Sequence, residues 1–348
     1  MFGTLRLFLA LLVVAGHVPH PGFSFELAVS AVILFYLITG HLMGLKFAAF
    51  RRTTTHPIRL FMLDRFFRVY PAYFVVLVVT TILVGTFGPS HSLPARIDAL
   101  SLLGNLALLP ANYYMFMPDF SAYIPQAFSL ALEEQFYLVL PFLLVYRRLF
   151  PVAIGVGLGF VLTAIGLSVA TGTLSKLTGD LWLYRLLPGT LAIFLLGVLV
   201  PGRDHPPSPW VKIILMAYAA LLFAAFLAGT ISSHLVFAVA IGVLVGYPVV
   251  SHCAGQARNP WDDALGKGAY GTFLCHITVI WAFQRFLGEW VAVHQFQFRL
   301  LVVVFSLAAG FGLYYAVDRP VERWRRMYAL DFIKRHPVDN GAGREPIR

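Results

Sequence analysis

Charged residues are scarce in this sequence, and their scarcity excludes an ordinary soluble domain. Only 12% of the 348 residues are Asp, Glu, Lys or Arg, while 59% are hydrophobic and the mean hydropathy is +0.78. Soluble globular domains carry about 25% charged residues. The composition therefore predicts a polytopic membrane protein. In a membrane protein an excess of Lys and Arg indicates which loops face the cytoplasm, so the formal net charge of +10 does not by itself point to nucleic acid. We expect no nucleic-acid partner.

Cysteine is also nearly absent, and the sequence shows no internal repeat. Cys253 and Cys275 form no CxxC pair and have no metal-ligand spacing, which argues against a disulfide framework and against a metal site. We expect both thiols to be packing residues. No inverted symmetry relates the two halves of the chain, which disfavours a secondary transporter.

Ten apolar runs are long enough to cross a bilayer as helices of about 20 residues. They lie at residues 4–20, 27–48, 69–87, 128–146, 151–171, 185–200, 210–229, 233–250, 268–287 and 297–317. An eleventh run, 97–110, is too short for a comfortable crossing and indicates an interfacial or re-entrant helix. The predicted fold class is an all-α integral membrane protein with about ten transmembrane helices.

The distribution of Lys and Arg predicts the orientation of these helices. With a cytoplasmic N-terminus, 21 of the 26 Lys and Arg residues fall on the cytoplasmic side, as the positive-inside rule requires. Both termini are then cytoplasmic. We expect one polytopic domain over residues 1–330 and a polar cytoplasmic tail over residues 331–348.

The first apolar run carries two polar residues on one helix face. Arg6 and His17 are eleven residues apart, which returns to within about 20° of the starting direction and spans about 16 Å along the helix. Polar groups aligned on an apolar helix usually face a protein interior or a water-filled path. Alternatively, Arg6 extends to the membrane interface and His17 satisfies a nearby polar group.

Two further constellations contain paired charges. Arg65 and Arg68 lie one turn apart, a spacing that can hold a phosphate, although cytoplasmic loops commonly carry such residues. Glu133 and Glu134 lie about a turn inside a predicted span, where an ionised group needs a partner. Because Glu133 and His17 are expected at similar depth, they suit an orienting carboxylate and a general base.

Four residues are additional candidates for the site: His276, Tyr137, Ser129 and Glu134. His276 interrupts an apolar span, and the other three lie on the same predicted helix as Glu133. His41 also interrupts a span, but a lone membrane histidine is often only hydrogen-bonded between helices.

Taken in order, these motifs resemble the acyltransferase-3 family of integral membrane O-acyltransferases. The resemblance rests on Arg6 to His17, FYLITG at 35–40, the RxxR of Arg65 and Arg68 followed by Tyr70 and Pro71, FSLALEEQFYLVLP at 128–141, FLCH ending at His276, and DRP at 318–320. The sequence departs from the family pattern at Phe128 in place of tryptophan, at Asp318 in place of glutamate and at His41.

This resemblance implies an enzyme that moves an acyl group, most simply acetyl, from acyl-CoA to a hydroxyl of an acceptor. Arg65, Arg68 and Arg6 would bind the CoA phosphates, His17 would be the general base, and Glu133 would orient it. A transient acyl-histidine is the alternative course of the reaction. No metal is implied.

The resemblance also implies a place and a partner for the protein. We expect a multi-pass protein of the bacterial cytoplasmic membrane, acting on a sugar of a surface polysaccharide or glycolipid, alone, as a homo-oligomer or with polysaccharide-export partners. A natural-product O-acyltransferase and a proton-coupled transporter are the competing hypotheses, and an export scaffold is a weaker one.

Overall fold

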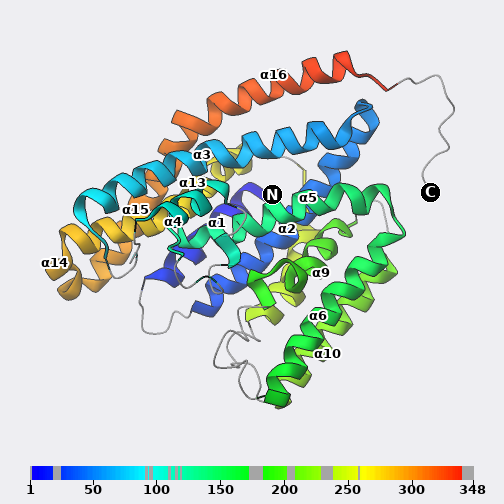
Figure 1. Ribbon diagram of the computed structural model, residues 1–348, viewed down its shortest axis with the longest axis horizontal. Helices are drawn as coiled ribbons and strands as arrows, with labels where there is room; N and C mark the ends of the chain where they lie inside the picture. The colour runs from blue at the N-terminus through cyan, green and yellow to red at the C-terminus, as the bar shows by residue number, and fades with distance from the viewer. Residues whose placement is uncertain are drawn as a thin grey trace.

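The computed structural model is helical throughout the residues that it describes, which are 2–18, 25–90, 93, 97–108, 111–113, 117, 120–171, 183–201, 208–228, 238–257 and 259–338 (Figure 1). Within these ranges only two isolated β-bridges occur, Thr54 with Pro337 and Ser90 with Leu93. The first half of the chain forms α1 (Phe2–His17), α2 (Phe25–Thr53), α3 (Pro57–Phe87), α4 (Ala99–Ala107), η2 (Pro125–Ala127) and α5 (Phe128–Val145). The second half forms α6 (Leu149–Thr171), α9 (Leu187–Val198), α10 (Pro209–Ala228), η3 (Ile241–Val245), α12 (Gly246–Ala254), α13 (Pro260–Phe286), α14 (Gly288–Val293), α15 (Gln295–Leu313), η4 (Tyr314–Asp318) and α16 (Arg319–Arg335).

Four helical segments are long and apolar enough to cross a membrane. They are Glu26–Thr53, Pro57–Phe87, Pro125–Val145 and Gln295–Arg335. Five shorter apolar helices lie at Phe2–Gly16, Leu149–Ala164, Leu187–Val198, Pro209–Ala224 and Ala238–Ala254. Each of the ten predicted apolar runs falls on a helix over its described residues, but the number of crossings and the orientation of the termini stay predictions.

Helix α1 lies at the centre of the bundle, packed against α13 on one side and α2 on the other (Figure 1). Glycine allows the close crossing of α1 and α13. A Cβ atom on Gly3 would come within 1.8 Å of the Asp262 carbonyl oxygen, and one on Gly266 within 2.6 Å of the Gly3 Cα. The two backbones therefore touch where both helices begin.

Helices α2 and α9 also pack at short range, while α6 and α10 lie side by side at the edge of the molecule (Figure 1). Gly197 of α9 faces the Leu37 carbonyl of α2, and Gly40 of α2 faces the Phe194 carbonyl of α9. Small residues at such crossings are typical of helices that associate in a membrane.

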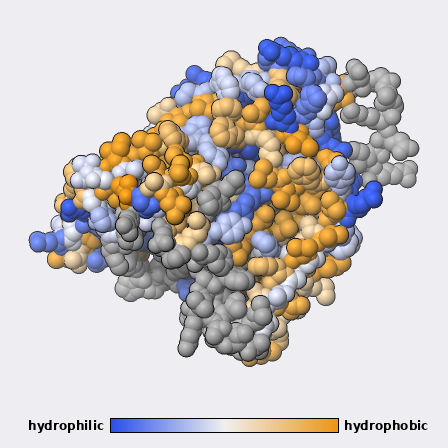
Figure 2. Space-filling model, viewed as in Figure 1, coloured by the Kyte–Doolittle hydropathy of each residue, from blue (hydrophilic) through white to orange (hydrophobic). Residues whose placement is uncertain are grey.

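The surface is rich in exposed apolar side chains. Phe74, Ile82 and Phe142 are all about half exposed, and Met216 and Leu227 are more so. Figure 2 shows hydrophobic side chains over much of one face and hydrophilic ones gathered where α16 lies. An apolar surface of this extent fits contact with lipid.

A short helix forms in the region where an interfacial or re-entrant helix was expected. Helix α4 covers nine residues, about 13.5 Å, which is too short to cross a bilayer. The Asp98 carboxylate caps its start by accepting a hydrogen bond from the Ser101 amide at 2.8 Å. Ser101 and Asn105 are buried, and the leucines on the opposite face are exposed.

The chain after the last predicted span is helical, which the sequence reading missed. A π-turn, η4, joins α15 directly to α16, and α16 lies along α3 (Figure 1). Trp324 of α16 contacts Phe67 of α3, with ring centroids 4.6 Å apart. The helix continues to Arg335 and so includes the first five residues of the predicted tail, and residues 339–348 lie outside the described residues.

Candidate functional site

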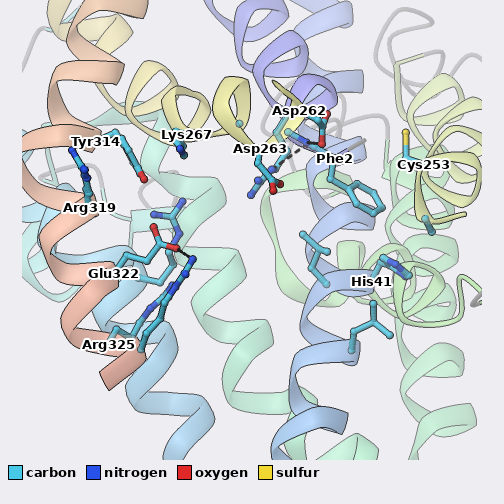
Figure 3. Close-up of a pocket in the computed structure, with 18 of the residues that line it drawn as sticks. Phe2, His41, Cys253, Asp262, Asp263, Lys267, Tyr314, Arg319, Glu322 and Arg325 are labelled. Carbon is cyan, nitrogen blue, oxygen red and sulfur yellow. Dashed lines mark hydrogen bonds and ion pairs between the residues drawn. The ribbon is translucent and has the colours of Figure 1, made fainter. Parts of the chain in front are cut away.

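A cavity of about 810 Å³ lies at the start of α1, and we call it the mouth (Figure 3). Its walls come from helices α1, α2, α3, α12, α13 and α16 and from η4. Seven cationic side chains line it: Arg6, Arg68, Lys267, Arg319, Arg323, Arg325 and Arg326. Its acidic side chains are Asp262, Asp263 and Glu322. Cations in such excess favour an anionic ligand.

Two of the three carboxylates in the mouth accept hydrogen bonds from other groups of the protein. The Asp262 carboxylate accepts hydrogen bonds from the Gly3 and Thr4 amides at 2.9 Å and 2.8 Å, so α13 caps the start of α1. Burial acts to raise the pKa of the Asp262 carboxyl, but the bonds from Thr4 and Gly3 outweigh it and lower the pKa to about 2. Glu322 accepts a hydrogen bond from Arg326.

Arg6 connects the mouth to a second cavity of about 130 Å³, the middle cavity, because it lines both. Arg68, Leu42 and Gly266 line both cavities as well. The Arg6 Nε atom donates to the Phe2 carbonyl at 3.2 Å. The first cation predicted on α1 therefore stands between the wide opening and the interior.

Arg68 of the RxxR motif pairs with the aspartate of the DRP motif. Its Nη1 lies 3.2 Å from the Asp318 Oδ2, and its guanidinium stands 5.0 Å from the centre of the Tyr270 ring. Asp318 is 5% exposed. Two motifs that are 250 residues apart in the sequence thus meet at the mouth.

Arg65 has a different position from Arg68. It is 6% exposed and lines the middle cavity but not the mouth, and its Nε donates to the Asp64 carboxylate at 3.0 Å. Asp64 also pairs with Lys46 at 2.9 Å and with Arg325 at 3.5 Å. Of the two arginines only Arg68 lines the mouth, while both line the middle cavity; that both bind the donor phosphates stays a prediction.

Glu133 lies in the wall of the middle cavity, where two hydroxyl groups hold its carboxylate. Thr39 Oγ1 donates to one oxygen at 3.0 Å and Tyr137 OH donates to the other at 2.7 Å. Ser129 lines the same cavity and donates to the Gln126 carbonyl at 3.2 Å. Glu134 has one buried oxygen, Oε1, without a hydrogen-bond partner among the residues described.

His17 lines a third cavity of about 30 Å³, the inner cavity, which shares Val32 and Phe273 with the middle one. The His17 Nδ1 lies 2.8 Å from the Val13 carbonyl oxygen. Because a carbonyl oxygen can only accept, Nδ1 carries the proton, and in the neutral ring Nε2 keeps its lone pair. That tautomer is the one a general base needs.

Glu133 and His17 line different cavities, the middle one and the inner one. Helix α5 begins at Phe128, which lines the inner cavity together with Gln126. Glu133 lies five residues further along α5, about 7.5 Å along the helix. The Val13 carbonyl is a partner of the imidazole, and an orienting role of Glu133 stays a prediction.

His276 lies against His17, with ring centroids 5.0 Å apart. Its ring is fully buried, its Nδ1 donates to the Phe273 carbonyl at 2.6 Å, and its Nε2 has no hydrogen-bond partner among the described residues. The two histidines of the sequence motifs therefore meet although they lie on α1 and α13.

Gln126 and Arg185 also line the inner cavity, and the sequence reading missed both as site residues. The Gln126 Nε2 donates to the Leu274 carbonyl at 2.6 Å, and its Oε1 has no partner among the described residues. The Arg185 guanidinium stands 4.4 Å from the centre of the Phe128 ring. The sequence held one sign that Arg185 belongs to a site, because this cation stands at the outer end of a predicted apolar run. No feature of the sequence pointed to Gln126.

The described residues contain no group of three His, Cys, Asp or Glu side chains that could hold a metal ion. Cys253 and Cys275 are free thiols.

Comparison with known proteins agrees with this arrangement. A family model for an acyltransferase domain, Acyl_transf_3, matches residues 3–318. An uncharacterized protein of Aquifex aeolicus (strain VF5) is 29% identical over 212 residues, which cover 58% of this chain and 89% of that protein. No solved structure matches. The apolar helices and the match over nearly its whole length show that this chain is a membrane acyltransferase of the acyltransferase-3 family.

Proposed function

We propose that the protein moves an acyl group, most simply acetyl, from acyl-CoA to a hydroxyl of an acceptor on the other side of the membrane. The observation that carries the proposal is the series of three cavities along α1, from the basic mouth to His17. Neighbouring cavities share lining residues, and the two ends of the series have different chemistry.

The donor would enter from the mouth, which we place on the cytoplasmic side. Phosphates of CoA match the cations there, and Arg68 is held in place by Asp318 and Tyr270. The pantetheine arm would extend along α1 through the middle cavity. The distance of about 16 Å from Arg6 to His17 is within the reach of that arm.

At the inner cavity the Nε2 of His17 would take the proton of the acceptor hydroxyl. The hydroxyl oxygen then forms a bond to the thioester carbon, the bond from carbon to sulfur breaks, and the thiolate receives the proton. In the alternative course, Nε2 forms a bond to the thioester carbon as the bond from carbon to sulfur breaks; the acceptor oxygen then takes the acyl group as the bond from carbon to nitrogen breaks, and the hydroxyl proton passes to the thiolate. Arg185 and Gln126 lie in the same cavity, where negative charge develops on the carbonyl oxygen.

The acceptor is proposed from the family and from the location of the inner cavity. A sugar of a surface polysaccharide or glycolipid in a bacterial cytoplasmic membrane is the first choice, and a natural product is the second. Mass spectrometry of surface glycans from a deletion strain and its parent tests the first choice, because the deletion should remove one acyl group per repeating unit.

The reaction itself is tested by thiol release. Purified protein in nanodiscs should release free thiol from acetyl-CoA in the presence of acceptor, and His17→Ala should abolish this while the protein stays folded. His252→Ala, which changes an exposed histidine outside the three cavities, is the matched control. Near-normal turnover by His17→Ala would reject the role of His17, and acceptor-independent uptake without thiol release would favour a transporter.

A further inference from the structure

The two walls of the mouth differ in chemistry (Figure 3). Lys267, Arg319 and Arg325, from α13 and α16, lie on one side. Phe2 and His41, from α1 and α2, lie on the other side. We call these two sides the basic wall and the ring wall. Asp262 and Asp263 lie close to Phe2 (Figure 3), and Leu42, Leu45, Cys253, Ala254 and Gln256 also line the mouth.

His41 on the ring wall is a buried polar side chain that the protein does not satisfy. It is 5% exposed, and its ring lies 5.5 Å from that of Phe2, tilted by 37°. No group of the described residues forms a hydrogen bond with either ring nitrogen of His41, and the residue lines the mouth. A ligand in the mouth can therefore use both the ring face and a ring nitrogen of His41 without displacing a protein partner.

The proposal rests on the proposed function, since it concerns the donor of that reaction. We propose that the Phe2–His41 pair is the subsite for the adenine base of the donor, while the phosphates lie on the basic wall. The rings offer a stacking surface, and the free nitrogen of His41 offers a hydrogen bond to the edge of the base.

The dimensions and charge of the mouth fit a nucleotide. A volume of about 810 Å³ is within the range of small-molecule sites, about 300–1,000 Å³. A simple phosphate would use only the basic wall and would leave His41 unsatisfied. A nucleotide engages both walls, because one end is an aromatic base and the other carries phosphates.

This subsite has a consequence for the choice of donor. Acyl-CoA and acyl-phosphopantetheine share the reactive arm, but only acyl-CoA carries a nucleotide. The enzyme should therefore prefer CoA thioesters over donors that present phosphopantetheine alone, and His41 should carry part of that preference.

The subsite is tested first by binding, without turnover. Calorimetry with adenosine 3′,5′-bisphosphate should show binding to the protein in nanodiscs that is about tenfold weaker in His41→Leu, because base-aromatic stacking of this kind contributes a factor of that order. His41→Phe, which keeps a ring, should retain most of the affinity. His252→Leu is the control, since His252 is exposed and does not line the mouth. Pyrophosphate, which has no base, should bind all four proteins equally.

Kinetics then tests the choice of donor. His41→Leu should raise the KM for acetyl-CoA about tenfold and leave the KM for acetyl-phosphopantetheine unchanged. Equal loss of bisphosphate and pyrophosphate binding, or no loss of either, would overturn the subsite while leaving the proposed function intact. Absence of thiol release by the wild type, with the bisphosphate result as expected, would overturn the proposed function and not the subsite. Phe2→Leu provides a second test if His41→Leu does not fold.

Discussion

The cap that Asp262 places on α1 leads to a quantitative prediction. Asp262→Asn removes the charge and one of the two acceptor oxygens that hold the Gly3 and Thr4 amides. The pKa of the Asp262 carboxyl falls from 3.8 to about 2 in the folded protein. At 1.36 kcal/mol per pKa unit, this corresponds to about 2 kcal/mol of stability at pH 7. Asp262→Ala removes both acceptors and should cost more.

The sign of the pH dependence follows from the lowered pKa. The folded protein binds this proton less readily than the unfolded chain, so the contribution is complete well above pH 3.8 and is lost as the pH falls toward 2. About half of this contribution to the free energy of unfolding should remain at pH 3. Asp262 precedes the predicted span 268–287, so the carboxyl can exchange protons with the aqueous phase.

Equilibrium unfolding in mixed micelles, followed by the fluorescence of the six tryptophans, measures this difference. The free energy of unfolding of Asp262→Asn should lie about 2 kcal/mol below that of the wild type at pH 7, and the gap should narrow at pH 3. Asp263→Asn, which alters the exposed neighbouring carboxylate, should match the wild type. Equal stability of Asp262→Asn and wild type at pH 7, or a gap that does not change with pH, would refute the capping argument.

Two further predictions concern packing and charge. Arg68→Ala leaves the buried Asp318 carboxylate without its cation and should lower the free energy of unfolding by about 3–5 kcal/mol. In the double variant, Asp318→Asn should restore part of the lost free energy. Strictly additive losses from the two substitutions would contradict the pairing. Gly197→Ala would place a Cβ 2.1 Å from the Leu37 carbonyl oxygen and should cost about 1–3 kcal/mol by forcing α2 and α9 apart. Gly155→Ala, where a Cβ meets nothing within 4 Å, is the control in the same equilibrium unfolding assay and should not be destabilised.

The sequence predicted the helices well because the apolar runs are long and are interrupted by Pro, Gly and charge. It failed for α16, whose basic and polar residues are typical of a solvated tail. That helix is held by tertiary contacts with α3, such as Trp324 on Phe67 and Arg325 on Asp64, and a local pattern cannot show these partners.

Within the site, helix periodicity placed residues of one helix correctly but not pairs on different helices. Arg6 and His17 share the cavity-lined face of α1, as eleven residues of spacing require. Glu133 and His17 line different cavities, which periodicity cannot predict because it does not fix how two helices are staggered. The ion pair between Arg68 and Asp318 could not be predicted from the sequence either, because it depends on how α3 and η4 pack in the folded protein.

The partition between the middle and inner cavities has a consequence for the membrane itself. A hollow that ran open from one face to the other would let protons and small ions leak, and the cell would lose the gradients on which its energy supply depends. Val32 and Phe273 line both spaces, so apolar side chains stand at their junction. Hydrocarbon at this junction would hinder the passage of ions between turnovers, and the arm of the donor would have to pass between these two side chains to reach His17.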